Sequence, residues 1–420
     1  MGIDLEGWKV SIRSAVDELR GQLLATSHDI HADPELLFKE YRASARLADE
    51  LERGGLRVER GVGGLATAFR AELDGGEPGP TLAILAEYDA LPGIGHACGH
   101  NIIAASALGT GLALARSGQR FAGRVLIIGT PAEEGGGGKI LLAEAGVFDD
   151  VDASFMLHPS RSDMVRRSSL ASSRVELVFH GKASHAAGAP DLGVNALEAV
   201  IQTFVGVNAR RLQMRADARV HGIITHGGDA VNIIPARASA RFSIRARDRA
   251  YQRHLAAMLR QAAEAGATAT GARLEWTETR GYDNTVPNPT VADVMARNMA
   301  ALGRTVVEPA PNERMGSTDM GDISQILPAV HAYFAIVPES IANHTVEFAA
   351  AAASPTGDAA VLDGAATLAM TAAELLAEPS LLARARADFD RQLAAGDVAG
   401  RARWLARGRE YTRAGSLDGP

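Results

Sequence analysis

The first half of the chain repeats a pattern of an apolar run, a polar loop and a helix-like segment. The apolar runs cover 81–87, 124–130 and 153–157, and such unbroken hydrophobic runs are typical of strands buried on both faces. Helix-like segments follow the first two runs, over 102–116 and 139–145. This alternation predicts an α/β fold whose central sheet is mostly parallel.

The N-terminal segment has helical rather than strand periodicity. Its apolar positions recur every three or four residues: Leu5, Trp8, Ile12, Val16, Leu19 and Leu23. This spacing predicts an amphipathic helix over 5–24. A second helix is expected over 44–53, ended by Gly54 and Gly55, and strands are expected over 57–59 and 66–73.

The hydrophobic period changes after Ser172. Alternating strands and two helices now follow in the order β-α-β-β-α-β, which matches the ferredoxin-like split βαβ unit. The expected strands are 174–179, 220–225, 236–247 and 272–279, and the expected helices are 193–211 and 249–265. We interpret residues 173–286 as an inserted α+β lid or dimerisation domain.

Beyond the inserted segment the first pattern resumes. We expect a strand over 329–336 and helices over 290–302 and 354–376. The predicted organisation is a catalytic domain formed by 1–172 together with 287–378, with the insertion at 173–286 and a C-terminal tail at 379–420.

Composition describes an ordinary soluble chain and excludes several classes of function. The 420 residues are 46% hydrophobic and 22% charged, and the formal net charge of -7 gives no sign of a nucleic-acid surface. No run approaches the ~18 uninterrupted apolar residues of a membrane span, and the first residues lack the apolar stretch of a signal peptide. The single cysteine fits a reducing compartment. We expect a cytoplasmic protein with no membrane or nucleic-acid partner.

Candidate chemistry begins where the first buried strand ends. His96, Cys98 and His100 follow a break at Pro92, and Gly99 leaves the backbone free to bend. A thiolate and an imidazole two residues apart suit a soft or borderline divalent metal such as zinc. The alternative is a small buried thiol between two loop histidines.

Further potential metal ligands follow the next two strands. Glu133 and Glu134 come directly after 124–130, and His158 ends 153–157. Because the carboxyl ends of parallel strands lie at one edge of a sheet, we expect these side chains to meet Cys98 there. Each also has a structural alternative: the two glutamates suit the N-terminus of the following helix, and His158 suits an ordinary strand end.

These residues belong to a set of motifs that resembles the M20 metallopeptidases. The resemblance is to the amidohydrolase branch, which includes aminoacylase-like, indole-acetyl-amino-acid and aminobenzoyl-glutamate hydrolases. The matching motifs span most of the chain and are His31-Ala-Asp-Pro-Glu-Leu, Asp89-Ala-Leu-Pro, His96-Ala-Cys-Gly-His, Pro131-Ala-Glu-Glu, His158-Pro, Gly181-Lys-Ala-Ser-His-Ala-Ala, Asn232-Ile-Ile-Pro and Gly316-Ser-Thr-Asp.

The resemblance implies a role for each matching side chain. The implied metal ligands are Cys98, His100, Glu134, His158 and His344. Glu133 resembles the general base, which takes a proton from metal-activated water. His185 and Asn232, in the insertion, resemble groups that polarise the substrate carbonyl, reaching into the partner's site of a homodimer. Asp89 is expected to orient one of the metal ligands without binding the metal itself.

One position departs from the family pattern. Many relatives have Asp after Cys-Gly-His, where this chain has Asn101. The neutral amide changes the charge behind His100, so the resemblance leaves the metal open: one or two divalent ions per subunit, zinc or manganese ahead of cobalt or nickel.

The expected function is therefore metal-dependent hydrolysis of a C–N bond. The predicted substrate is a small N-acyl or N-aroyl amino acid or a dipeptide, cleaved by metal-activated water with Glu133 as base. The alternatives are an aminohydrolase acting on a small aromatic amine, and a catalytically silent scaffold subunit of the same fold. A homodimer formed through the insertion is also expected.

Overall fold

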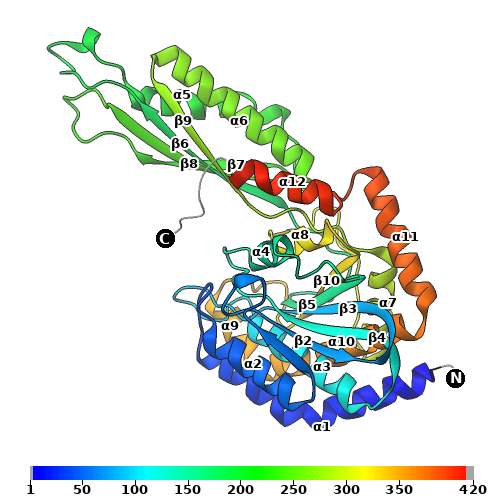
Figure 1. Ribbon diagram of the computed structural model, residues 1–420. Helices are drawn as coiled ribbons and strands as arrows, with labels where there is room; N and C mark the ends of the chain where they lie inside the picture. Colours follow the sequence, from blue (N-terminus) through cyan, green and yellow to red (C-terminus); the bar gives the residue numbers. More distant parts are fainter. Residues whose placement is uncertain (1–2, 413–420) are drawn as a thin grey trace. The chain divides into compact units, whose positions relative to one another are not determined.

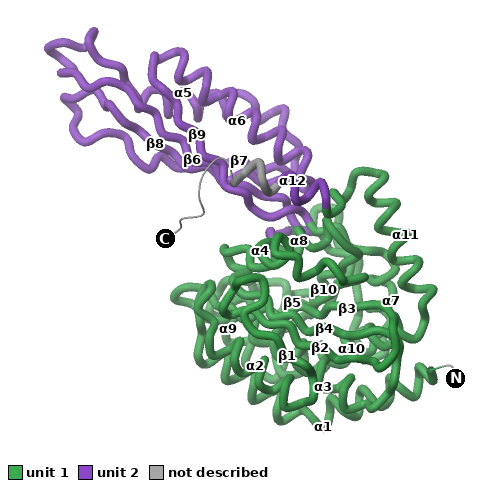
Figure 2. Tube along the Cα trace, viewed as in Figure 1, with its two compact units in different colours: residues 1–168, 285–314, 318–401 green, residues 169–284, 315–317, 402–420 purple. Residues whose placement is uncertain are grey.

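The computed structural model describes residues 3–412. The chain forms two compact units, distinguished by colour in Figure 2. Of the described residues, unit 1 contains 3–168, together with 285–314 and 318–401. Unit 2 contains 169–284, 315–317 and 402–412. Each unit has its own hydrophobic core.

Unit 1 is built on a six-stranded sheet in the order β1-β2-β4-β3-β5-β10. The strands are β1 (Arg57–Arg60), β2 (Phe69–Asp74), β3 (Gly76–Ala86), β4 (Phe121–Gly129), β5 (Ala153–Ser160) and β10 (Ala329–Ala335). The last four are parallel to one another, and β1 and β2 add an antiparallel edge. The predicted α/β class with a mostly parallel sheet is confirmed.

Three long helices of unit 1 pack against one another (Figure 1): α1 (Leu5–Ala32), α3 (His100–Arg116) and α10 (Pro355–Ala377). α3 and α10 also pack against the sheet. α10 is long and apolar enough to cross a membrane by length and composition, but 89% of its most apolar window is buried. This burial makes it a core helix of the fold. The other helices of unit 1 are α2 (Tyr41–Arg53), α4 (Gly138–Glu144), α7 (Pro289–Ala301), α8 (Met320–Ser324), α9 (Val346–Ala352) and α11 (Pro379–Ala395).

Unit 2 is a four-stranded antiparallel sheet with two packed helices. The sheet order is β7-β8-β6-β9, which leaves β7 as an edge strand. Its elements are β6 (Ala171–His180), α5 (Ala196–Ala209), β7 (Arg219–His226), β8 (Arg237–Ala246), α6 (Arg249–Thr270) and β9 (Arg273–Arg280), and α12 (Arg401–Thr412) follows at the end of the chain. The predicted β-α-β-β-α-β order is therefore present.

Several helix boundaries differ from the predicted ones, and hydrogen bonds explain two of the differences. α1 continues to Ala32 because Thr26 and Ser27, although polar, are buried and bonded to Glu50 and Asn101. α5 begins at Ala196 rather than at 193, because the side chain of Asn195 accepts the N–H groups of residues 197 and 198 and caps the helix there.

Candidate metal centre

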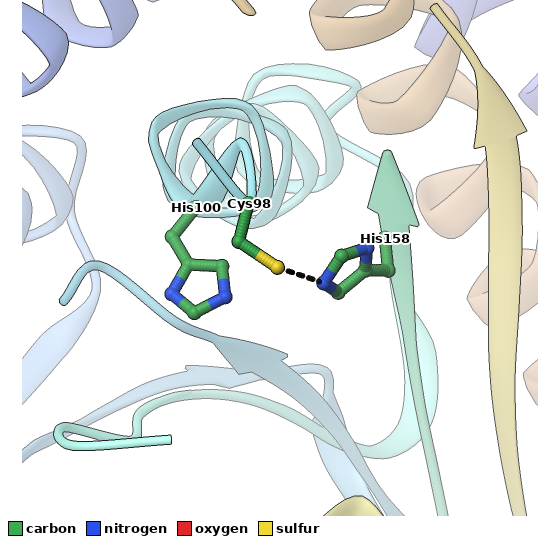
Figure 3. A group of neighbouring side chains, drawn as sticks. All are labelled: Cys98, His100 and His158. Atoms are coloured by element: carbon green, nitrogen blue, oxygen red, sulfur yellow. Dashed lines mark hydrogen bonds between the residues drawn. The ribbon is translucent and has the colours of Figure 1, made fainter. Parts of the chain in front are cut away.

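The carboxyl ends of β3, β4 and β5 bring the predicted ligands of unit 1 together. Ligand atoms of Cys98, His100 and His158 lie within 4.8 Å of one another, as do those of Cys98, Glu134 and His344. Cys98 belongs to both groups. Figure 3 shows the first group, with the Cys98 Sγ atom 3.3 Å from Nε2 of His158. Side chains that are 246 positions apart in sequence thus converge at one edge of the sheet.

The turn between Cys98 and His100 depends on glycine. Gly99 has a left-handed φ of 76°, which favours glycine, and it precedes the first residue of α3. A Cβ atom at this position would lie 2.8 Å from Cγ of Pro159, closer than packed carbon atoms allow. The absence of a side chain therefore lets the turn pack directly against the end of β5, beside His158.

Asp89 connects two of the strand ends. Its Oδ1 accepts the Nδ1–H of His100 at 3.0 Å, and its Oδ2 accepts the backbone N–H of Glu134 at 3.0 Å. Burial raises the pKa of Asp89, but the hydrogen bond and charge of His100 outweigh it and keep the pKa below its ordinary value. An ionised Asp89 fixes the His100 tautomer, so that Nε2 is left as a ligand atom.

His344 comes from the loop between β10 and α9. It has a positive φ of 64°, and its backbone N–H donates to the carbonyl of Ala97 at 2.9 Å. Its Nε2 lies 3.6 Å from Oε1 of Glu134, while half of the side chain remains exposed. The backbone bond to Ala97 thus anchors the His344 loop to the turn that contains Cys98.

The donor set fits a divalent cation. Nε2 of His100 and Oε1 of Glu134 are buried and make no hydrogen bond within the described residues. Burial lowers the pKa of His158 to about 4, so its ring is neutral at pH 7. Burial, followed by the charge of Glu134, raises the pKa of the Cys98 thiol, so its thiolate needs a nearby positive charge. One sulfur, imidazole nitrogens and a carboxylate suit a borderline metal.

Glu133 lies beside the ligands without belonging to either group that contains Cys98. It forms a third group with His100 and Glu134, again with ligand atoms within 4.8 Å. Burial, and then the charges of Glu87 and Asp319, raise the pKa of Glu133 well above its ordinary value. A carboxyl with a raised pKa is suited to take up and release a proton near neutral pH.

A buried network of charged side chains lies behind the predicted ligands, and the sequence patterns did not predict it. Nζ of Lys139 lies 2.5 Å from Glu87 and 2.7 Å from Asp319, and all three side chains are fully buried. Oε2 of Glu87 lies 3.4 Å from Nε2 of His100. The two carboxylates outweigh burial and raise the pKa of Lys139. The one sequence feature that could have indicated this network is Glu87, a charged residue at the end of an apolar run.

Asn101 is directed toward the helices. Its Nδ2 donates to Oγ of Ser27 and to the carbonyl of Ala352, each at 2.9 Å. These bonds join α3 to α1 and α9 instead of reaching a cluster side chain. The expectation that Asn101 acts on His100 therefore has no hydrogen bond to support it within the described residues.

His185 and Asn232 are neighbours in unit 2. Both are exposed, and the N–H of Ala186 donates to the carbonyl of Asn232 at 3.0 Å. Nδ1 of His185 accepts the backbone N–H groups of Ala187 and Gly188. The neutral ring therefore has its proton on Nε2, which is available as a donor.

Comparison with known proteins identifies a matching family, similar sequences and a similar solved structure. The model of peptidase family M20/M25/M40 matches residues 83–373. The Xaa-Arg dipeptidase of Mus musculus is 38% identical over 401 residues, covering 92% of this chain and 93% of that protein. One of the p-aminobenzoyl-glutamate hydrolase subunits of Escherichia coli K12 is 32% identical over 313 residues, covering 70% of this chain and 65% of that protein. The crystal structure of a dinuclear metal-binding peptidase of the M20 family from Bacillus subtilis superposes with a TM-score of 0.70 at 23% identity, covering 86% and 99% of the two chains.

Proposed function

This chain belongs to peptidase family M20/M25/M40 and is a metal-dependent hydrolase of peptide or amide bonds, and we propose that its substrate is a dipeptide or an N-acyl or N-aroyl amino acid. The observation that supports this proposal most directly is the convergence of Cys98, His100, Glu134, His158 and His344 beside the buried carboxyl of Glu133. A catalytically silent scaffold has no need to keep these side chains together.

The proposed mechanism assigns the proton transfers to Glu133. A bound divalent ion would polarise the scissile carbonyl and lower the pKa of water, and the five converging side chains would hold it. The Glu133 carboxylate accepts the proton of the attacking water and later donates it to the nitrogen of the leaving amine. Asp89 keeps His100 in its orientation throughout. Nε2–H of His185 is the proposed donor to the oxygen that becomes negative, with Asn232 beside it.

The metal content we propose is one or two ions of zinc or manganese per subunit, with cobalt or nickel as substitutes. Cys98 supports two ions because its sulfur belongs to two groups of potential ligand atoms, so the same thiolate would serve an ion in either group. The relative from Bacillus subtilis is described as dinuclear. Metal analysis by mass spectrometry after reconstitution would give the ratio directly.

We also propose a cytoplasmic homodimer formed through unit 2. β7 is an edge strand and exposes Ile223, and α5 exposes Ile201 and Val205. An unpaired strand with apolar side chains is a surface that a second copy covers well. Sedimentation at micromolar concentration should show a dimer, and a monomer throughout that range would contradict the proposal.

The substrate proposal is tested with a panel of compounds. The relative named Xaa-Arg dipeptidase makes dipeptides with a C-terminal arginine the first choice, followed by N-acetyl amino acids and p-aminobenzoyl-glutamate. Protein stripped with chelator and reloaded with zinc or manganese should hydrolyse at least one amide, and chelator should abolish the activity. Release of ammonia from an aryl amine without amide cleavage would favour the aminohydrolase alternative. Full metal loading with no turnover of any compound would favour the scaffold.

A further inference from the structure

Three buried acids of unit 1 form a carboxylate cluster behind the candidate metal centre. Oxygen atoms of Glu87, Glu133 and Asp319 lie within 4.8 Å of one another, and all three residues are buried. Several carboxylate oxygens at this spacing are the ligands that a hard cation such as manganese or magnesium prefers. Among the described residues, neither ligand group that contains Cys98 includes Glu87 or Asp319. The cluster is therefore a second place in which the chemistry of the side chains suits a divalent ion.

An ammonium group lies against two of these acids. Nζ of Lys139 lies 2.5 Å from Oε1 of Glu87 and 2.7 Å from Oδ1 of Asp319. The backbone N–H of Lys139 also donates to Oδ2 of Asp319 at 3.0 Å, so one residue binds both oxygens of that carboxylate. Burial lowers the pKa of Lys139, but the three carboxyl groups outweigh burial and raise it. The side chain therefore keeps its positive charge in the interior.

The chain before Lys139 explains why a lysine is buried here. Gly138 is the first residue of α4, and a Cβ atom on it would lie 1.8 Å from the carbonyl oxygen of Pro131. A backbone atom cannot move away from such a contact at small cost, so only glycine allows α4 to begin this close to the end of β4. Lys139 follows directly and is fully buried, whereas a lysine is normally exposed. The local backbone is thus built to bring this ammonium to the acids.

The carboxylate cluster also has an oxygen that nothing else satisfies. Oε2 of Glu87 is buried and makes no hydrogen bond within the described residues. It lies 3.4 Å from Nε2 of His100, which is a predicted metal ligand. Buried acids whose charge is not balanced are costly, so removal of the ammonium would leave a strong demand for another cation. A divalent ion taken up there would lie directly behind the candidate metal centre.

We propose that Lys139 is a tethered cation that excludes metal ions from the carboxylate cluster and thereby keeps Glu133 uncoordinated. An ion held by Glu87 and Asp319 would also be within reach of Glu133, whose oxygen lies within 4.8 Å of theirs. A carboxylate that coordinates a metal ion is no longer free to take a proton from water. Lys139 is therefore a positioning residue, and it restricts divalent ions to the candidate metal centre. The role of Glu133 rests on the proposed function, whereas the exclusion of metal does not.

The first test measures metal content. Lys139→Ala removes both the charge and the volume of the side chain, so it should create an ion site. After saturation with manganese and desalting, mass spectrometry should give one more ion per chain in Lys139→Ala than in the wild type. The additional substitution Asp319→Asn should return the ratio to the wild-type value. Lys9→Ala is the matched control, because Lys9 also pairs with a nearly buried acid, Glu374, and it should keep the wild-type ratio. A wild-type ratio in Lys139→Ala with native circular dichroism would overturn the proposal.

The second test separates this role from a merely structural one. With the best amide substrate, manganese added beyond saturation of the centre should lower kcat of Lys139→Ala roughly 10²-fold with little change in KM, because the added ion coordinates the base. The wild type and Lys9→Ala should show no such loss. Activity of Lys139→Ala that is independent of manganese in this range would contradict the proposal. If the wild type hydrolyses no amide, the proposed function fails, and the metal ratio still decides the role of Lys139.

A measurement on the wild type does not depend on how the variants fold. Crystals of the wild-type protein soaked in manganese should show anomalous density at the candidate metal centre and none among the three acids. An anomalous peak between Glu87, Glu133 and Asp319 in the wild type would overturn the proposal directly.

Discussion

Glu40 is a buried carboxyl that supports the loop carrying Glu133, and replacing it with glutamine should change the pH dependence of stability. Its Oε1 accepts the N–H groups of Phe38 and Ala132 at 2.9 Å each, and its Oε2 accepts the hydroxyl of Thr67 at 2.9 Å. Burial raises the pKa of Glu40 from 4.5 to about 7, against the opposing effect of its hydrogen bonds. Glutamine has the same shape and keeps an acceptor for both N–H groups.

The sign and size of the effect follow from that pKa. Because the folded-state pKa lies above the unfolded value of 4.5, the contribution of Glu40 to stability is fully present below pH 4.5 and is lost as the pH rises through 7. The difference between the two pKa values corresponds to an upper limit of roughly 3 kcal/mol. A neutral glutamine avoids this loss. Relative to the wild type, Glu40→Gln should therefore gain about 2 kcal/mol in free energy of unfolding between pH 5 and pH 8.

Urea titrations followed by circular dichroism at pH 5, 6, 7 and 8 measure this difference. The protein should be treated with chelator, because a bound cation would add a positive charge near Asp89 and Glu40. Glu52→Gln is the control, since Glu52 is an exposed acid on α2 that pairs with Arg60, and its effect should stay below about 0.5 kcal/mol. A difference between Glu40→Gln and wild type that stays constant from pH 5 to pH 8 would refute the reasoning.

Three further variants test the metal centre. Glu133→Gln should bind metal as the wild type does but lose roughly 10²- to 10⁴-fold in kcat, measured with the best amide substrate; retention of most activity would exclude Glu133 as the base. Asp89→Asn should weaken metal binding about 10- to 100-fold, measured by competition with a chromogenic chelator, because His100 loses its charged acceptor. Gly99→Ala should lower the free energy of unfolding by roughly 1–3 kcal/mol, since its Cβ meets Pro159 and its φ is positive; an unchanged urea midpoint would show that the turn relaxes freely.

Strand ends were the most predictable part of the site. Cys98, Glu134 and His158 follow apolar runs, and parallel strands bring their carboxyl ends to one edge, so their convergence follows from the pattern alone. His344 differs, because it lies in a loop with positive φ and no periodic pattern surrounds it. Its position depends on a backbone bond to Ala97, which is far away in sequence. Only the family resemblance pointed to it.

Burial of polar groups was the least predictable part. Lys139 lies in the first turn of the short helix α4, where a lysine is normally exposed, and its burial depends on two acids from distant segments, Glu87 and Asp319. Likewise, α1 extends past its apolar stripe because Thr26 and Ser27 find partners on other helices. Local periodicity contains no information about such long-range partners, so both features appear only in the folded chain.

The position of α10 near the end of the sequence has a consequence for biosynthesis. Its partners α1 and α3 are complete once residue 116 has left the ribosome, but α10 begins only at Pro355. At about 5–20 residues per second, translating 117–354 takes roughly 10 to 50 seconds. During that interval the apolar faces of α1 and α3 that α10 buries remain exposed. Chaperones therefore have a long time in which to bind the nascent chain. A chain terminated before residue 355 should accordingly be recovered in inclusion bodies, whereas the full chain should be soluble.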